Sequence, residues 1–291
     1  MARRISGTNE NIGITLLQLL RQLLTTAGER SCFCLRSIDL LCRSIMDQLN
    51  NYADDRLIRG CIYCAGPADT RDHVPSRCLL DRPYPPNLPV VGCCESCNQD
   101  FSKDEEYFVC LIESVLCGST DPDKIGRSSV ANIMRRSPAL RARIEAARTE
   151  VDGQLAFVPE GERVSKVMLK LARGHAAFEL SQPCRTEPDH FWCGPLASLP
   201  QEGRDAFDSV HFQQMLGEIG SRSIQRLLVI QMALQSESGE QQQFGMLIND
   251  WVDVQDDRYR YLAIDDGGGL VIRIVVAEYL ACEVAWRLEA A

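Results

Sequence analysis

Residues 61–98 read CIYCAGPADTRDHVPSRCLLDRPYPPNLPVVGCCESCN, and this stretch decides the fold expected for its part of the chain. Two Cys-x-x-Cys pairs frame it: Cys61 with Cys64, and Cys94 with Cys97. Each pair can direct two sulfurs at one ion, so the four cysteines have the spacing of a tetrahedral zinc site. The 29 residues between the pairs exceed the roughly 15–20 of a simple zinc ribbon, so the clamp is expected to hold a folded insertion.

Two more cysteines lie in the same stretch and offer alternatives. Cys93 precedes Cys94 directly, so Cys93 and Cys97 form a second pair with a longer spacing. We favour Cys94, because its spacing from Cys97 matches that of the first pair. Cys78 lies inside the insertion and is expected to pack in the interior, as reduced cysteine often does.

The motifs of this stretch also follow a known order. The order Cys-x-x-Cys, Asp72-His73-Val-Pro, Pro-Asn87-Leu and Cys-x-x-Cys-Asn98 resembles the HNH endonuclease family, whose members are built on a ββα-metal finger. The resemblance covers about residues 57–110. It implies a first strand that ends at His73, a loop that contains Asn87 and a helix that begins near Asn98.

The residue types suit the chemistry of that family. Hydrolysis of a phosphodiester needs an activated water and a cation on the phosphate oxygens. An imidazole titrates near neutrality, so His73 suits the role of general base. Asp72 and Asn98 offer the hard oxygen ligands that Mg²⁺ or Mn²⁺ prefers. By resemblance, Asn87 fixes the loop and orients the His73 ring, while zinc is structural.

Each of these assignments has a simpler alternative. His73 could be a structural histidine or a fifth zinc ligand. Asn87 follows two prolines and could be an ordinary turn residue. Asn98 could serve as a helix N-cap, a position that asparagine favours.

Basic residues near this module are candidates for nucleic-acid contact. Lys103 follows Asn98 closely but stands beside three acidic residues, so a solvated helix face is the alternative. Residues 124–148 hold seven basic residues against one acid and are expected to form two short helices that break at Pro138. Within them, Arg127, Arg135 and Arg136 could contact a phosphate backbone. A solvated basic face is again the simpler reading.

Composition and charge set the broad class. Of 291 residues, 45% are hydrophobic and 24% are charged, which is ordinary globular usage. The net charge of −9 argues against a general nucleic-acid coat protein, which would need a basic surface. The first residues lack a convincing signal peptide, and no apolar run is long enough to span a bilayer. The chain has 14 cysteines, and the clustered ones read as metal ligands, so a reducing cytoplasm is the expected compartment.

The fold class expected is α+β, in four segments. An N-terminal extension occupies residues 1–50; Met46 is a candidate for the true translation start, and a helical oligomerisation arm is the alternative. The HNH-like module takes 51–120, a helical basic segment 121–182, and a β-rich domain of unassigned role 183–291.

The pattern of the C-terminal half predicts several elements. Residues 162–180 are expected to form a helix with one apolar face, in which His175 is a core residue. Residues 183–202 are rich in proline and are expected to form a loop. Strands are predicted, from their β-branched and aromatic residues, at 227–232, 243–254, 259–264 and 270–276. The last apolar segment could continue the sheet or form a helix.

The resemblance therefore implies a metal-dependent endonuclease of bacterial or phage origin that acts on double-stranded DNA, with structural Zn²⁺ and catalytic Mg²⁺ or Mn²⁺. One such centre cuts one strand, so a double-strand break would require a homodimer or two events. The alternatives are a zinc-dependent nucleic-acid-binding module that does not cut, and a protein–protein adaptor that uses the C-terminal sheet.

Overall fold

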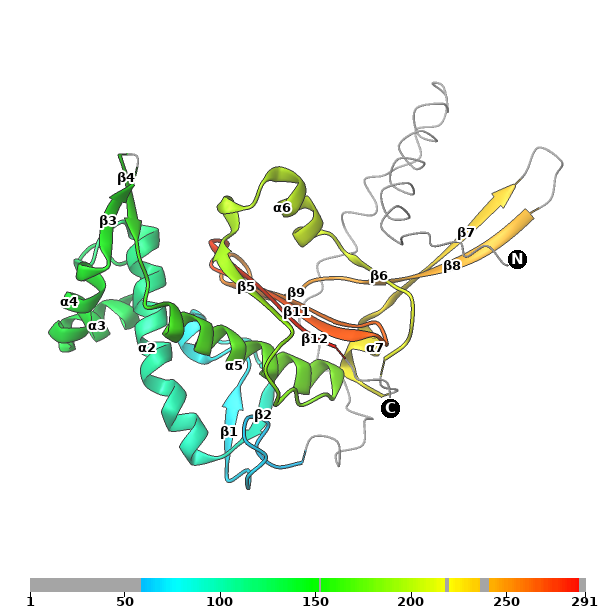
Figure 1. The fold of residues 1–291 in the computed structure, drawn as a ribbon, viewed down its shortest axis with the longest axis horizontal. Coiled ribbons are helices and arrows are strands. Elements are labelled where there is room, and N and C mark those ends of the chain that lie inside the picture. Colours follow the sequence, from blue (N-terminus) through cyan, green and yellow to red (C-terminus); the bar gives the residue numbers. More distant parts are fainter. Residues whose placement is uncertain (1–58, 152, 218–219, 236–240, 288–291) are drawn as a thin grey trace, which may run out of the picture. The chain divides into compact units, whose positions relative to one another are not determined.

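The structure is a computed structural model that describes residues 59–287 except 152, 218–219 and 236–240 (Figure 1). The chain divides into two compact units, Met1–Arg43 and Ser44–Ala291, and the described residues all belong to the second. Within this unit helices and strands form an α+β fold. The hypotheses about residues 1–50, including the start at Met46 and the oligomerisation arm, lie outside the described residues.

The unit begins with a hairpin followed by a long helix. Strands β1 (Thr70–His73) and β2 (Val90–Cys93) pair antiparallel, and His73 lies opposite Val90. Helix α2 (Glu95–Cys117) follows β2 directly. It begins earlier than the resemblance implies, because Cys94 is its N-cap and accepts a hydrogen bond from the Cys97 backbone N–H. The N-cap role considered for Asn98 is therefore wrong.

The basic segment forms two short helices, as predicted. They are α3 (Ser128–Arg136) and α4 (Pro138–Ala146), with Pro138 in the first turn of α4, where its missing N–H costs no helical hydrogen bond. A small hairpin of β3 (Arg148–Val151) and β4 (Gln154–Phe157) follows. These elements lead into α5 (Gly161–Leu180), which matches the predicted helix.

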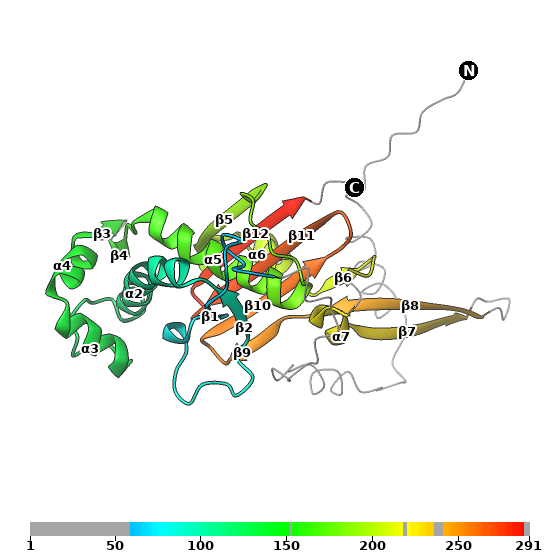
Figure 2. The same cartoon turned by 90° about the horizontal axis from the view of Figure 1, so that it is seen from below.

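A five-stranded antiparallel sheet forms the centre of the unit, with helix α5 packed against it (Figures 1 and 2). Its order is β5-β12-β11-β10-β9, made from β5 (His190–Pro195), β9 (Val252–Gln255), β10 (Tyr259–Asp265), β11 (Gly269–Val276) and β12 (Leu280–Arg287). One buried core includes Tyr107 of α2, Leu171 of α5 and Ile272 of the sheet. The three expected segments 51–120, 121–182 and 183–291 thus contribute to one shared core.

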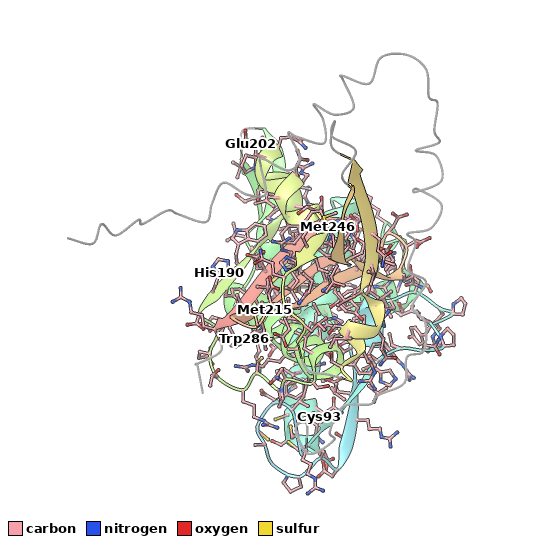
Figure 3. The ribbon with its side chains drawn as sticks, turned by 90° about the vertical axis from the view of Figure 1, so that its right-hand side faces the viewer. Cys93, His190, Glu202, Met215, Met246 and Trp286 are labelled. Atoms are coloured by element: carbon pink, nitrogen blue, oxygen red, sulfur yellow. The ribbon has the colours of Figure 1, made fainter. Side chains whose placement is uncertain are left out.

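The sequence missed strand β5. Residues 183–202 were expected to form a loop, but β5 pairs with β12 along the sheet edge, where Figure 3 shows His190 and Trp286. The expectation is wrong because a neighbouring strand supplies hydrogen bonds that a proline-rich composition does not reveal. The last apolar segment is strand β12 rather than a helix.

A second sheet has the order β6-β8-β7. Its strands are β6 (His211–Gln213), β7 (Leu228–Gln235) and β8 (Gln241–Asn249). The predicted strand at 243–254 is in fact two strands, because β8 ends at Asn249 and β9 begins at Val252. The short elements η3, η4, α6 and α7 span Arg77–Leu79, Leu196–Ser198, Gln201–Asp208 and Arg222–Arg226.

His175 of α5 is a core residue, as predicted. Its side chain is fully buried, its Nε2 lies 2.8 Å from the Tyr259 hydroxyl oxygen, and its ring stacks on Tyr261 at 3.8 Å between centroids. Its Nδ1 has no partner among the described residues. Burial, assisted by the charge of Arg226, lowers the pKa of His175 to about 3.

This burial should make stability depend on pH. The unfolded chain binds a proton at His175 near pH 6.5, whereas the folded chain binds it only near pH 3. The free energy of unfolding should therefore fall as the pH drops below 6.5. His175→Phe should remove this loss and make the slope shallower by about 1.4 kcal/mol per pH unit, measured by urea unfolding between pH 7 and 4. An unchanged slope would contradict the assignment.

Candidate metal centre and the polar cluster beside it

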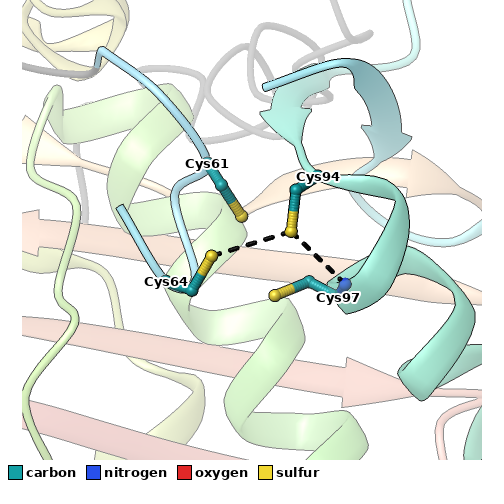
Figure 4. A group of neighbouring side chains, drawn as sticks. All are labelled: Cys61, Cys64, Cys94 and Cys97. Atoms are coloured by element: carbon teal, nitrogen blue, oxygen red, sulfur yellow. Dashed lines mark hydrogen bonds between the residues drawn. The ribbon is translucent and has the colours of Figure 1, made fainter. Parts of the chain in front are cut away.

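The four predicted zinc ligands meet at one point (Figure 4). Cys61 and Cys64 come from the turn before β1, Cys94 caps α2, and Cys97 lies in its first turn. Their four Sγ atoms lie within 4.8 Å of one another, and the Sγ atoms of Cys64 and Cys94 are 3.6 Å apart. A tetrahedron with Zn–S bonds of about 2.3 Å places its sulfurs about 3.8 Å apart. The cluster could therefore hold a metal ion and is compatible with zinc.

The two other cysteines of this stretch lie outside the cluster. Cys93 is fully buried, and its Sγ donates a hydrogen bond to the Cys94 carbonyl at 3.2 Å. Cys78 packs against the main hydrophobic core, and burial raises the pKa of its thiol to about 12. Cys78 therefore packs in the interior, as predicted, and the position of Cys93 agrees with the choice of Cys94 over Cys93.

The backbone around the first cysteine pair is tightly folded. The Cys61 N–H donates to the Gly66 carbonyl at 2.7 Å, and the Ala65 N–H donates to the Cys61 carbonyl at 2.9 Å. Gly60 has a φ of 78°, and a Cβ there would lie 2.8 Å from the Gly66 oxygen, so only glycine fits. The Arg185 guanidinium also donates to the Cys61 carbonyl. The turn is thus held in place from two sides.

The cysteines differ in their tendency to ionise. Burial opposes ionisation of Cys61, but hydrogen bonds from the backbone of Cys94, Cys64 and Tyr63 outweigh it and bring its pKa to about 6. Burial and the neighbouring thiols raise the pKa of Cys97. A divalent cation would allow more thiolates to coexist, because metal binding releases the remaining protons.

His73 lies at the end of β1, and its side chain is partly exposed. Burial is the main cause that lowers the pKa of His73, and the positive charge of Arg77 adds to it. A neutral imidazole can accept a proton, which a general base must do. Successive residues of a strand point to opposite faces, so His73 and Asp72 face different sides of the hairpin.

Asp72 is buried, with 7% of its surface exposed, and it already has two partners. The Tyr63 hydroxyl donates to its Oδ2 at 2.8 Å, and Lys170 Nζ lies 2.8 Å from the same oxygen. Lys170 comes from α5 and also contacts Glu105 of α2 and Ser76. Burial opposes the charge on Lys170, but Glu105 and Asp72 outweigh it and raise its pKa. We call Tyr63, Asp72, Ser76, Glu105 and Lys170 the Lys170 cluster.

This cluster bears on the predicted magnesium site. Asn98 lies in the second turn of α2, and its Nδ2 contacts Thr70 Oγ1 at 3.5 Å. Asp72, Glu105 and Asn98 together offer the oxygen ligands that Mg²⁺ prefers. However, the Lys170 ammonium lies between the two carboxylates, so a divalent ion shared by both would need Lys170 to move. These oxygen atoms are of the type that Mg²⁺ prefers. The Lys170 ammonium, however, already occupies the position between the Asp72 and Glu105 carboxylates.

Asn87, Lys103 and Arg127, which were also predicted to belong to the site, differ in their burial. Asn87 lies in the turn before β2 and is partly buried. Lys103 is exposed on α2. Arg127 is buried, and its guanidinium bonds Asp81 at 2.7 Å and the Leu80 carbonyl at 2.5 Å. Arg127 is therefore held inside the protein rather than presented to a ligand on the surface.

Arg135 and Arg136 remain on the surface of α3. Arg135 is exposed and pairs with Asp123 at 2.7 Å, and Arg136 donates to the Asn132 carbonyl at 3.2 Å. Both contacts are exposed, and such pairs contribute little to stability. These two guanidinium groups are thus free to exchange their partners for phosphate.

Sequence reasoning missed Lys170 and Glu105. A signal for Lys170 was present, because it is a single charge within the apolar run VMLKLA of a helix, and a buried charge needs a partner. Glu105 carried no such signal, since it stands in an acidic run that reads as a solvated face.

No model of a known protein family, no curated protein and no solved structure matches the chain. Among the described helices, none combines the length and the apolar character that a bilayer crossing requires.

Proposed function

We propose that this chain is a metal-dependent endonuclease of the HNH type that hydrolyses phosphodiester bonds, with DNA as its substrate. The observation that carries the proposal is the arrangement of β1, β2 and α2 with the cysteine cluster. β1 ends at His73, β2 leads through Cys94 into α2, and four cysteines join the start of the hairpin to the start of the helix. This is the order of elements that a ββα-metal finger requires.

The residues divide into structural and chemical roles. Zinc at the four cysteines would hold the hairpin to the helix. His73 would take the proton of the attacking water, and its partly exposed imidazole with a lowered pKa supports this role. A divalent cation, when bound, supplies charge stabilisation at the phosphate oxygens. Asp72, once Lys170 has moved away from it, and Asn98 would bind it, with Asn87 orienting the loop and Arg135 and Arg136 contacting the duplex backbone.

A plasmid-nicking assay tests the proposal. The purified protein should nick or linearise supercoiled plasmid in the presence of Mg²⁺ or Mn²⁺. His73→Ala should lose at least about a hundredfold in rate, since a general base contributes about 10²–10⁴-fold, while it keeps its bound zinc and its thermal transition. The matched control is His190→Ala, which removes an exposed histidine of β5 and should cut at the normal rate.

Two results would contradict the proposal. Cutting that survives in His73→Ala would remove this residue from the role of base. A zinc-loaded protein that cuts neither DNA nor RNA with either metal would reject the enzyme altogether.

A nucleic-acid-binding module that does not cut is the second candidate. The position of Lys170 favours it, because this ammonium already pairs with both Asp72 and Glu105. Salt-sensitive binding of DNA without cutting, at equal strength in the wild type and in His73→Ala, would support this candidate over the first.

A further inference from the structure

A large cavity lies between the insertion of the cysteine clamp and helix α3. Its volume is about 800 Å³, within the range of small-molecule and cofactor sites. Its walls come from η3 and the loop after it, from the start of α3 and from Arg258. None of the four cysteines and no member of the Lys170 cluster lines it. No proposed catalytic residue lines the cavity, although Arg77 in its wall is near enough to His73 to lower the pKa of that imidazole.

Four arginines line this cavity against a single acid, Asp81. Two of them, Arg127 and Arg258, are fixed by Asp81, at 2.7 and 2.6 Å, and by Glu113. These two arginines and two carboxylates balance one another in charge. They form a rigid wall rather than a free binding group.

The other two arginines have no acidic partner among the described residues. Arg77 and Arg82 are exposed, and both guanidinium groups lie over the ring of Tyr84, at 5.5 and 5.6 Å from its centroid. The cavity therefore has an excess positive charge carried by two arginines. Arginine is the side chain best suited to bidentate contact with phosphate.

The remaining walls would suit the rest of a ligand. Leu80, Val109 and Ile133 supply apolar surface, and Ser128 and Ser129 supply hydroxyl groups. Ser128 and Ser129 also open α3, whose first turn has no side-chain cap, so its positive end adds to the field of the arginines. A ligand that joins an anionic group to a less polar ring would suit these walls.

We infer that this cavity binds a nucleotide unit, with its phosphate on Arg77 and Arg82 and its base against Leu80, Val109 and Ile133. The unit can be a free nucleotide or one residue of an unpaired strand, since both present the same phosphate and base. This inference goes beyond the proposed function, because binding here requires neither a catalytic metal nor cleavage.

Fluorescence polarisation with a labelled oligothymidylate of about ten residues tests the inference. The full-length, zinc-loaded protein is used without added Mg²⁺ or Mn²⁺, so that cutting does not interfere. Arg77→Ala with Arg82→Ala should weaken binding by more than about tenfold. It should also reduce the magnitude of the salt slope by about 1.4, from two lost phosphate contacts on a single strand. The matched control, Arg141→Ala with Arg287→Ala, removes the same charge from exposed positions outside the cavity.

A second variant tests the cavity without removing charge. A Cβ at Gly126, which lines the cavity, would meet no atom within 4 Å. Gly126→Trp should therefore fill the space and block binding in a protein that still folds, whereas Gly126→Ala should bind normally. Thermal unfolding of each variant verifies that it is folded.

The outcomes separate the two sources of the ligand. Competition by thymidine monophosphate, but not by inorganic phosphate, identifies a free nucleotide as sufficient. Binding that only a competing strand displaces identifies the unpaired strand. If the oligonucleotide does not bind, or if neither the arginine pair nor Gly126→Trp weakens it more than the controls do, the inference is overturned. His73→Ala should bind as the wild type does, so loss of cutting and loss of this site are distinguishable.

Discussion

Cys97→Ser is expected to release the bound metal and to unfold the hairpin and the start of α2. The four Sγ atoms form one closed cluster, and a serine hydroxyl is a poor replacement for a thiolate ligand. Structural zinc contributes about 10–16 kcal/mol of apparent binding free energy in small zinc domains. The apolar core beneath this site is small, with Ile62, Val74, Val91 and Phe101 among its buried members. It cannot replace that contribution.

Metal content by mass spectrometry and unfolding followed by circular dichroism would measure this effect. The wild type should contain about one zinc per chain, and a strong chelator should reproduce the loss seen in Cys97→Ser. The decisive control is Cys93→Ser, which alters a buried cysteine next to Cys94 but outside the cluster. It should keep its zinc while losing some stability. Zinc retained in Cys97→Ser and lost in Cys93→Ser would show that the cluster is assigned to the wrong cysteines.

The cysteine cluster could be predicted because it depends on the short spacing within each Cys-x-x-Cys pair. The spacing of Cys61 and Cys64 restricts both sulfurs to one turn, and a helix that starts at Glu95 brings Cys97 back to its N-cap. The two helices that break at Pro138 depend on an equally local rule. These parts of the fold agree with the structure.

The parts that could not be predicted depend on distant partners. Strand β5 exists because β12, almost ninety residues later, pairs with it. Asp72 was expected to face a metal, but Lys170 of α5 reaches it from 98 residues away. A single sequence contains no direct record of such pairings. Only the structure therefore shows which buried side chains contact a residue that was predicted to ligate a metal.

Lys170→Met is expected to destabilise the protein by about 3–5 kcal/mol at pH 7, because it leaves two carboxylates without their cation. Lys170 is 2% exposed, and its ammonium contacts both Asp72 and Glu105. Methionine keeps most of the volume of the side chain, so the loss is electrostatic rather than a cavity. The matched control is Lys166→Met on the same helix. Its ammonium pairs with Asp100 and Asp104 while 37% of the side chain is exposed, so the cost should be about 1 kcal/mol or less.

The pH dependence of the wild type follows from the same contacts. The folded pKa of Lys170 is raised above its ordinary value of 10.5, so its contribution is fully present below pH 10.5 and is lost as the pH rises through the higher folded value. Lys170→Met lacks this contribution, so the difference in the free energy of unfolding between the wild type and the variant should shrink as the pH rises through the folded pKa of Lys170.

Lys170→Met also tests whether Asp72 and Glu105 can bind a divalent cation. If Asp72 and Glu105 can hold a metal, Mg²⁺ or Mn²⁺ should raise the melting temperature of the variant but not that of the wild type, where the ammonium occupies the position. Stabilisation is expected because a ligand that binds only the folded state shifts the equilibrium toward it. A variant that gains nothing from either ion would show that Asp72 is a structural partner of Lys170. The oxygen ligands of the proposed nuclease would then have to come from Asn98 and the exposed side of the hairpin.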